Sequence, residues 1–110
     1  LTEETRNLIT LNELKQMKRS AILINAARGG IVNEADLYTA LKEKIIWAAG
    51  SDVFETEPIT ANHPLLTLDN FVGLPHIGSA TIETRKAMMQ CNVDSLIAAA
   101  KGEDIPYVVR

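Results

Sequence analysis

The sequence contains little cysteine, no long apolar segment and no excess of basic charge. Its single cysteine, Cys91, excludes a disulfide bond within the chain and fits a reducing compartment, so we expect a cytoplasmic protein. No stretch approaches the ~20 apolar residues of a membrane-spanning helix, and we expect no membrane partner. The formal net charge of −3 gives no indication of nucleic-acid binding.

The length and composition are those of one small globular domain. The chain has 110 residues, of which 46% are hydrophobic and 23% are charged. It opens on Leu1-Thr2-Glu3-Glu4 without a methionine. We therefore expect a fragment of a longer protein.

Short apolar runs alternate with helical patterns along the chain. The runs predict strands buried on both faces, at about 21–27, 47–54 and 71–74. Apolar positions at helical spacing predict helices over about 11–18, 34–43 and 80–101. This order favours a parallel α/β sheet. A sheet of three strands is narrow and has two open edges, which again suggests part of a larger domain.

Capping residues support the helix boundaries. Thr10 and Glu13 form a capping-box pattern, Asn33 is a preferred N-cap, and Gly102 stops the last helix. The apolar stripe of the last helix is interpreted as core, and Cys91 within this helix as a packing residue. The stripe consists of Met88, Met89, Val93, Leu96, Ile97 and Ala100.

Polar residues follow each predicted strand. Arg28 follows the first, Asp52 ends the second with Glu57 just beyond, and His76 follows the third. In open α/β sheets, ligands bind beyond the carboxyl ends of the strands. The sequence therefore brings an arginine, two carboxylates and a histidine to one edge of the sheet.

This set of side chains suits a specific reaction. Arginine matches a carboxylate in bidentate fashion, and histidine exchanges a proton near neutral pH. A carboxylate beside the histidine favours imidazolium and selects the ring tautomer. Together they could hold a 2-keto acid and protonate its carbonyl oxygen as hydride arrives. The hydride must come from a cofactor, because no side chain supplies one.

A simpler structural role is open for each of the four residues. Arg28 could pair with Glu34 or Asp36. The others could cap a turn, lie on the surface of a loop, or be a satisfied core histidine. Their convergence on one edge favours a shared site. His63 lies in a loop between predicted elements and is interpreted as structural.

Three ordered motifs resemble one enzyme family. They are "LKQMKRSAILINAARGGIVNEADLYTAL" at 14–41, "AAGSDVFETEP" at 48–58 and "NHPLLTLDNFVGLPHIGSAT" at 62–81. The chain closely resembles the D-isomer-specific 2-hydroxyacid dehydrogenases. Within them, the last motif is most similar to the glyoxylate/hydroxypyruvate reductase branch, which includes enzymes that act on 2-ketogluconate.

The resemblance implies a role for each site residue. Arg28 would bind the substrate's carboxylate and carbonyl oxygen, and Glu57 would orient the histidine and favour its protonated form. His76 would be the general acid for reduction and the base for oxidation. Asp52 would contact the nicotinamide end of NAD(P)H. No metal site is implied. The implied cofactor-binding residues are Ala26, Ala27, Arg28, Asp52, His76, Gly78 and Ser79.

The resemblance also implies an incomplete domain. The chain would be the C-terminal half of a Rossmann-type NAD(P)-binding domain, with the terminal helix over about 80–101 reaching back to an absent substrate domain. The family's Gly-x-Gly-x-x-Gly turn, which binds the pyrophosphate, is not in the 110 residues. We expect the chain alone to be inactive and the complete protein to be a homodimer.

Two alternatives and two departures from the family pattern remain. A dehydrogenase-like transcriptional corepressor that senses NAD would keep the same arginine, acid and histidine. A truncated product could have no function of its own.

Ser51 stands where the family often has leucine, and Lys44 stands where a glycine commonly ends the helix. If Lys44 is left-handed, it costs about 1 kcal/mol.

Overall fold

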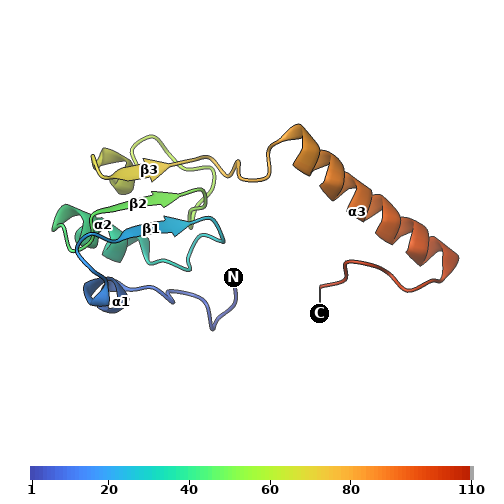
Figure 1. The fold of residues 1–110 in the computed structure, drawn as a ribbon, viewed down its shortest axis with the longest axis horizontal. Helices are drawn as coiled ribbons and strands as arrows, with labels where there is room; N and C mark the ends of the chain where they lie inside the picture. Colours follow the sequence, from blue (N-terminus) through green and yellow to red (C-terminus); the bar gives the residue numbers. More distant parts are fainter. Residues whose placement is uncertain (110) are drawn as a thin grey trace. The chain divides into compact units, whose positions relative to one another are not determined.

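The computed structural model describes residues 1–109 and divides them into two compact units, Leu1–Ile77 and the residues from Gly78 onward (Figure 1). The first unit contains most of the secondary structure. Its helices are α1 (Leu11–Gln16), α2 (Glu34–Lys42) and the 3₁₀ helix η1 (Pro64–Thr67), and its strands are β1 (Ile22–Asn25), β2 (Ala48–Ser51) and β3 (Phe71–Gly73). The second unit contains α3 (Ile82–Lys101).

The three strands form one parallel sheet in the order β1-β2-β3. Ile24 pairs with Gly50, which in turn pairs with Val72, so the three strands keep a common register. The predicted parallel α/β arrangement is confirmed. Because the strands run in the same direction, their carboxyl ends meet at one edge.

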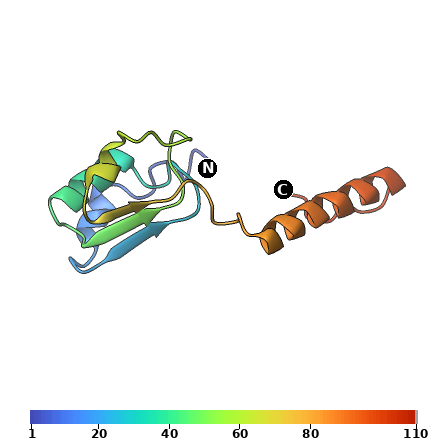
Figure 2. The same cartoon turned by 90° about the horizontal axis from the view of Figure 1, so that it is seen from above.

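One face of the sheet carries the hydrophobic core. Figure 2 shows α2 and η1 on one side of the strands, and side chains from both helices pack with those of the strands. The buried residues that pack together in this core are Leu14, Val32, Leu37, Ala40, Leu41, Ile46, Ala49, Phe54, Leu65 and Phe71. Leu37 and Leu41 form the buried face of α2, and Tyr38 packs against the same core while partly buried.

The prediction that the strands are buried on both faces is wrong for this chain. Ile22, Ile24 and Val72 are 55%, 68% and 63% exposed. Alternation along a strand sends successive side chains to opposite faces, and only one face is covered within residues 1–109. The apolar runs look continuous because the sequence is apolar at both sets of positions.

The predicted helix caps are present. The backbone N–H of Thr10 donates to the Glu13 carboxylate at 2.8 Å, as in a capping box. The side chain of Asn33 accepts from the backbone N–H of Asp36 at 2.9 Å. Gly102 ends α3 in the left-handed conformation, with φ 70°. These local rules fix where each helix begins or ends.

The apolar stripe of α3 is exposed, which corrects the interpretation of its methionines as core. Met88 and Met89 are 54% and 64% exposed, and Leu96 is 70% exposed. Cys91 is half-buried. Among the helix residues, only Ala98 is buried. Within the described part of the chain, no helix combines the length and apolarity needed to cross a membrane.

Both departures from the family pattern are accommodated locally. Lys44 has φ 56°, so it adopts the left-handed conformation. The following residue, Ile45, donates its N–H to the Ala40 carbonyl at 2.8 Å, which completes the turn that ends α2. Ser51 is buried, and its hydroxyl donates to the Val53 carbonyl at 2.7 Å.

Lys44 provides a test of the local backbone. Lys44→Gly should raise the free energy of unfolding by about 1 kcal/mol, because glycine has no Cβ atom to clash at positive φ. Urea denaturation measures the change. Lys44→Ala is the matched control, since it removes the charge and keeps the Cβ atom. An equal gain in both variants would assign the effect to the charge instead.

Candidate active site

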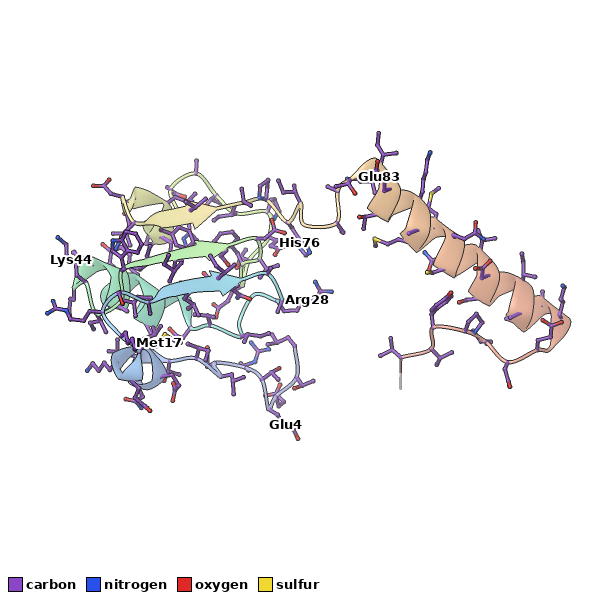
Figure 3. All side chains as sticks on the ribbon, in the orientation of Figure 1. Glu4, Met17, Arg28, Lys44, His76 and Glu83 are labelled. Atoms are coloured by element: carbon purple, nitrogen blue, oxygen red, sulfur yellow. The ribbon has the colours of Figure 1, made fainter. Side chains whose placement is uncertain are left out.

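The predicted site residues gather at the carboxyl edge of the sheet. Figure 3 shows Arg28 and His76 at one end of the sheet and Lys44 at the other. Arg28 belongs to the turn after β1, and His76 follows β3. The topology therefore brings together residues that are 48 positions apart in sequence (76 − 28).

A buried amide shapes the turn that carries Arg28. The Asn25 side chain donates to the Arg28 carbonyl at 3.1 Å and accepts from the Ala27 N–H at 3.2 Å. Asn25 is only 9% exposed, so these bonds satisfy a polar group inside the protein. Sequence reasoning missed this residue. The signal was present, because Asn25 is the one polar residue in the run from Ala21 to Ala27.

A glycine brings this turn against residues 52–58, the loop after β2 that carries Glu55 and Glu57 and is called the acidic loop below. A Cβ atom added to Gly29 would overlap the backbone carbonyl of Phe54 and crowd the N–H of Glu55. Only a residue without a side chain permits so close an approach. The turn of Arg28 and the loop of Glu57 are consequently in direct backbone contact.

Glu57 and His76 form a hydrogen-bonded pair. His76 Nδ1 lies 2.7 Å from Glu57 Oε2, and the side chains are 45% and 35% exposed. The other carboxylate oxygen, Oε1, accepts from the Phe54 N–H at 3.0 Å. Both oxygens of Glu57 therefore have a partner. Phe54, Pro58, Ile59 and Pro75 line a small recess beside the pair.

The surroundings of Glu57 favour its ionised form. The hydrogen bond to His76 lowers the pKa of the Glu57 carboxyl below its ordinary value, and the bond from Phe54 N–H adds to this effect. The positive charges of His76 and Arg28 lower the same pKa further, by smaller amounts.

Backbone geometry holds His76 in place. His76 has φ 58°, a left-handed conformation that is uncommon for residues other than glycine. The next residue, Ile77, donates its N–H to Asp52 Oδ1 at 2.8 Å. Asp52 thus organises the turn after β3, the capping role left open by the sequence. Its role at the nicotinamide end stays a prediction.

The simpler explanation for Arg28 does not match the structure. Within residues 1–109, Arg28 forms no ion pair. Glu34 instead contacts His63 at 2.8 Å, and Asp36 accepts from the Leu11 N–H at 2.9 Å. The guanidinium is exposed at the carboxyl edge.

The structure locates only some of the other residues predicted to contact the cofactor. Ala26 and Ala27 are exposed directly after β1. Gly78 and Ser79 belong to the second unit, so their place in a cofactor pocket stays a prediction. In the described part of the chain, no three side chains of His, Cys, Asp or Glu are grouped so that they could hold a metal ion.

The Glu57–His76 contact has a direct spectroscopic test. His76→Ala should raise the pKa of the Glu57 carboxyl toward its ordinary value, because the largest cause of its depression is removed. Carboxyl ¹³C chemical shifts followed from pH 2 to about 7 measure this pKa, with the other glutamates as internal references. An unchanged Glu57 titration would contradict the contact.

The chain is similar to proteins of one known family. Residues 1–78 match the family described as D-isomer specific 2-hydroxyacid dehydrogenase, NAD binding domain. Glyoxylate/hydroxypyruvate reductase B of Serratia proteamaculans is 58% identical over 102 residues, which cover 93% of this chain and 31% of that protein.

Solved structures of related enzymes share the fold. An NADPH-dependent glyoxylate/hydroxypyruvate reductase from Sinorhizobium meliloti, in complex with NADP and malonate, aligns with a TM-score of 0.82 at 41% identity, over 88% of this chain and 30% of that one. D-lactate dehydrogenase with NAD+ from Lactobacillus jensenii gives 0.85 at 33% identity, over 100% and 37%.

Proposed function

Because the chain belongs to the D-isomer specific 2-hydroxyacid dehydrogenases, we propose that it is the C-terminal half of the NAD(P)-binding domain of a 2-keto acid reductase. The reductase would convert glyoxylate or hydroxypyruvate, and 2-ketogluconate as a bulkier candidate, to the D-2-hydroxy acid. The observation that carries the proposal is the Glu57–His76 pair at the carboxyl edge of the sheet, where Arg28 forms no ion pair within residues 1–109.

The chain spans 31% of the Serratia relative, so the activity belongs to a longer protein. We propose that α3 reaches the substrate domain of that protein. The exposed apolar stripe of α3 supports this, because apolar surface of that extent is normally covered. The tests below use the full-length protein.

The residues present fit the nicotinamide end of the cofactor. Nicotinamide, when reduced, supplies the hydride that no side chain can supply. Asp52 and the exposed backbone of Ala26 and Ala27 lie at or next to the strand ends where family sites form. That Gly78 and Ser79 also bind the cofactor stays a prediction from the family resemblance. The pyrophosphate-binding glycine turn is not among the 110 residues.

His76 would supply the proton. Its Nδ1 is engaged by Glu57, which leaves Nε2 as the nitrogen that can donate to a substrate carbonyl oxygen. Ionised Glu57 favours the imidazolium, the form that has a proton to give. In the reverse direction the same nitrogen would accept the proton of the hydroxy acid.

Arg28 would bind and orient the substrate. Its planar guanidinium can donate two parallel hydrogen bonds to the carboxylate of a 2-keto acid, and it also polarises the adjacent carbonyl. Because Arg28 forms no ion pair within residues 1–109, this fork is available to a ligand. The turn held by Asn25 gives it a defined position.

We also propose a cytoplasmic homodimer. The single cysteine, which forms no disulfide, supports a reducing compartment. The exposed apolar residues Ile22, Ile24 and Val72 support a need for cover by other parts of the protein or by a second copy. Cell fractionation and light scattering test both assignments. A secreted protein or a monomer at assay concentration would contradict them.

Replacing His76 tests the proposed chemistry. His76→Gln should lower kcat by about 10²- to 10⁴-fold, the usual contribution of a general acid, while cofactor affinity stays close to wild type. Stopped-flow turnover and fluorescence titration with NAD(P)H separate the two effects. Near-wild-type turnover in this variant would remove His76 from the mechanism.

The role of Glu57 predicts a change in pH dependence. Reduction needs protonated His76, so the rate falls as pH rises and the imidazolium loses its proton. Glu57→Gln removes the negative charge beside the imidazolium, so this falling limb should move to lower pH. The pH profile of kcat measures it. If the fall in kcat occurred at the same pH in Glu57→Gln as in the wild type, Glu57 would be only a surface residue of the loop.

A further inference from the structure

We propose that Glu34 and His63 are positioning residues for Glu57 and, through Glu57, for His76. This inference rests on the proposed reductase function and deepens it. The pair lies on α2 and in the loop before η1, outside the set of Arg28, Glu57 and His76. It contacts the acidic loop at Phe54 and Glu55.

The pair has a defined geometry and proton arrangement. His63 Nε2 lies 2.8 Å from Glu34 Oε2, and both side chains are less than one-fifth exposed, at 19% and 18%. His63 Nδ1 accepts from the Leu65 N–H at 3.2 Å. In the neutral ring, the proton therefore sits on Nε2 and is donated to Glu34.

The pair holds the acidic loop by two separate contacts. Glu34 Oε1, the oxygen not used by His63, accepts from the Glu55 N–H at 2.7 Å. The His63 ring packs edge-on against the Phe54 ring, with centroids 5.5 Å apart. Phe54 is 5% exposed, so its ring is fixed within the core. The Phe54–Glu55 peptide is thus held from the side of α2.

The backbone on both sides of the Phe54 Cα atom holds the site. On one side, the Phe54 N–H donates to Glu57 Oε1 at 3.0 Å, and Glu57 Oε2 contacts His76 at 2.7 Å. On the other side, the Phe54 carbonyl, which shares a peptide with the Glu55 N–H, meets Gly29 at close approach. A shift of the Phe54 backbone would therefore move the Glu57 carboxylate and the turn of Arg28 together. Misplacement by ~1 Å can cost about 10²-fold in rate.

If Glu34 and His63 had only a structural role, replacing them would lower stability without changing the acid–base behaviour of the site. If they position Glu57, replacing them would also change the titration of the site. The charged groups around His76 are Glu57 from the acidic loop, Arg28 from the turn after β1, and Asp52 from the end of β2. Within residues 1–109, Glu34 forms no hydrogen bond or ion pair with the side chains of Glu57, Arg28 or His76, so its effect on their titration must pass through the loop.

The test compares Glu34→Ala and His63→Ala with Glu34→Gln in the full-length protein. Glutamine keeps an oxygen that can accept from the Glu55 N–H, whereas alanine does not. We expect both alanine variants to lower kcat by about tenfold, less than the 10²-fold of a 1 Å misplacement. Their falling pH limb should move toward that of Glu57→Gln. Glu34→Gln should restore most of the rate.

Two controls make the result specific. Thr39→Ala changes the same helix outside the network and should leave the pH profile unchanged, because its hydroxyl bonds only to the Ala35 carbonyl. In a Glu57→Gln background, His63→Ala should add no further pH shift, because residues that act in one chain are not additive. If His63→Ala shifted the pH limb by the same amount with and without Glu57→Gln, the proposal would be overturned.

A second readout does not depend on activity. Both alanine variants should raise the pKa of the Glu57 carboxyl toward its ordinary value, followed by ¹³C chemical shifts, since the Phe54 and His76 bonds loosen. If the wild type reduces no keto acid but Glu57 responds, the proposed function fails and the positioning network stands. If an alanine variant does not fold, His63→Asn replaces it, with the same shift expected. An unchanged Glu57 pKa together with an unchanged pH limb would overturn the inference.

Discussion

The hydrogen bond between Glu57 and His76 is the interaction on which the rest of the site depends. It joins the acidic loop to the end of β3, and it selects the histidine nitrogen that remains available for proton transfer. The pair is partly exposed, so its position relies on backbone contacts behind it. The backbone of Phe54 supplies them, because its N–H donates to Glu57 and its carbonyl meets Gly29.

The parallel sheet explains why this contact can form from distant parts of the chain. Parallel strands bring their carboxyl ends to one edge, and each of the three delivers its own turn there. Asn25 shapes the first turn and Asp52 the last, each by bonding to backbone groups. The geometry of the site is therefore set by side chains that bind the backbone and by one glycine that permits close approach.

Much of this fold could be predicted from local rules. Capping residues and hydrophobic spacing located the helices within a few residues, and the order of elements indicated a parallel sheet. The exposure of Ile24 and of Met89 could not be predicted, because apolar periodicity shows which side chains need cover and not whether this chain provides it. Both residues lie on surfaces that residues 1–109 leave uncovered.

The sequence predicted which residues form the site, but not the backbone conformation and contacts that hold them in place. Strand ends located Arg28, Asp52, Glu57 and His76, whereas the left-handed backbone of His76 has no sequence signal. The contact of His63 with Glu34 joins residues 29 positions apart across a loop and a helix, and no periodicity reports such a pairing. Long-range polar contacts of this kind depend on the tertiary structure.

Turnover is the most direct test of the central claim. The full-length protein is mixed with glyoxylate or hydroxypyruvate, each with NADH and with NADPH, and the loss of nicotinamide absorbance is followed. The account predicts turnover of at least one keto acid, and the same experiment identifies the preferred cofactor. A protein that binds the cofactor and reduces neither these acids nor 2-ketogluconate would contradict the claim.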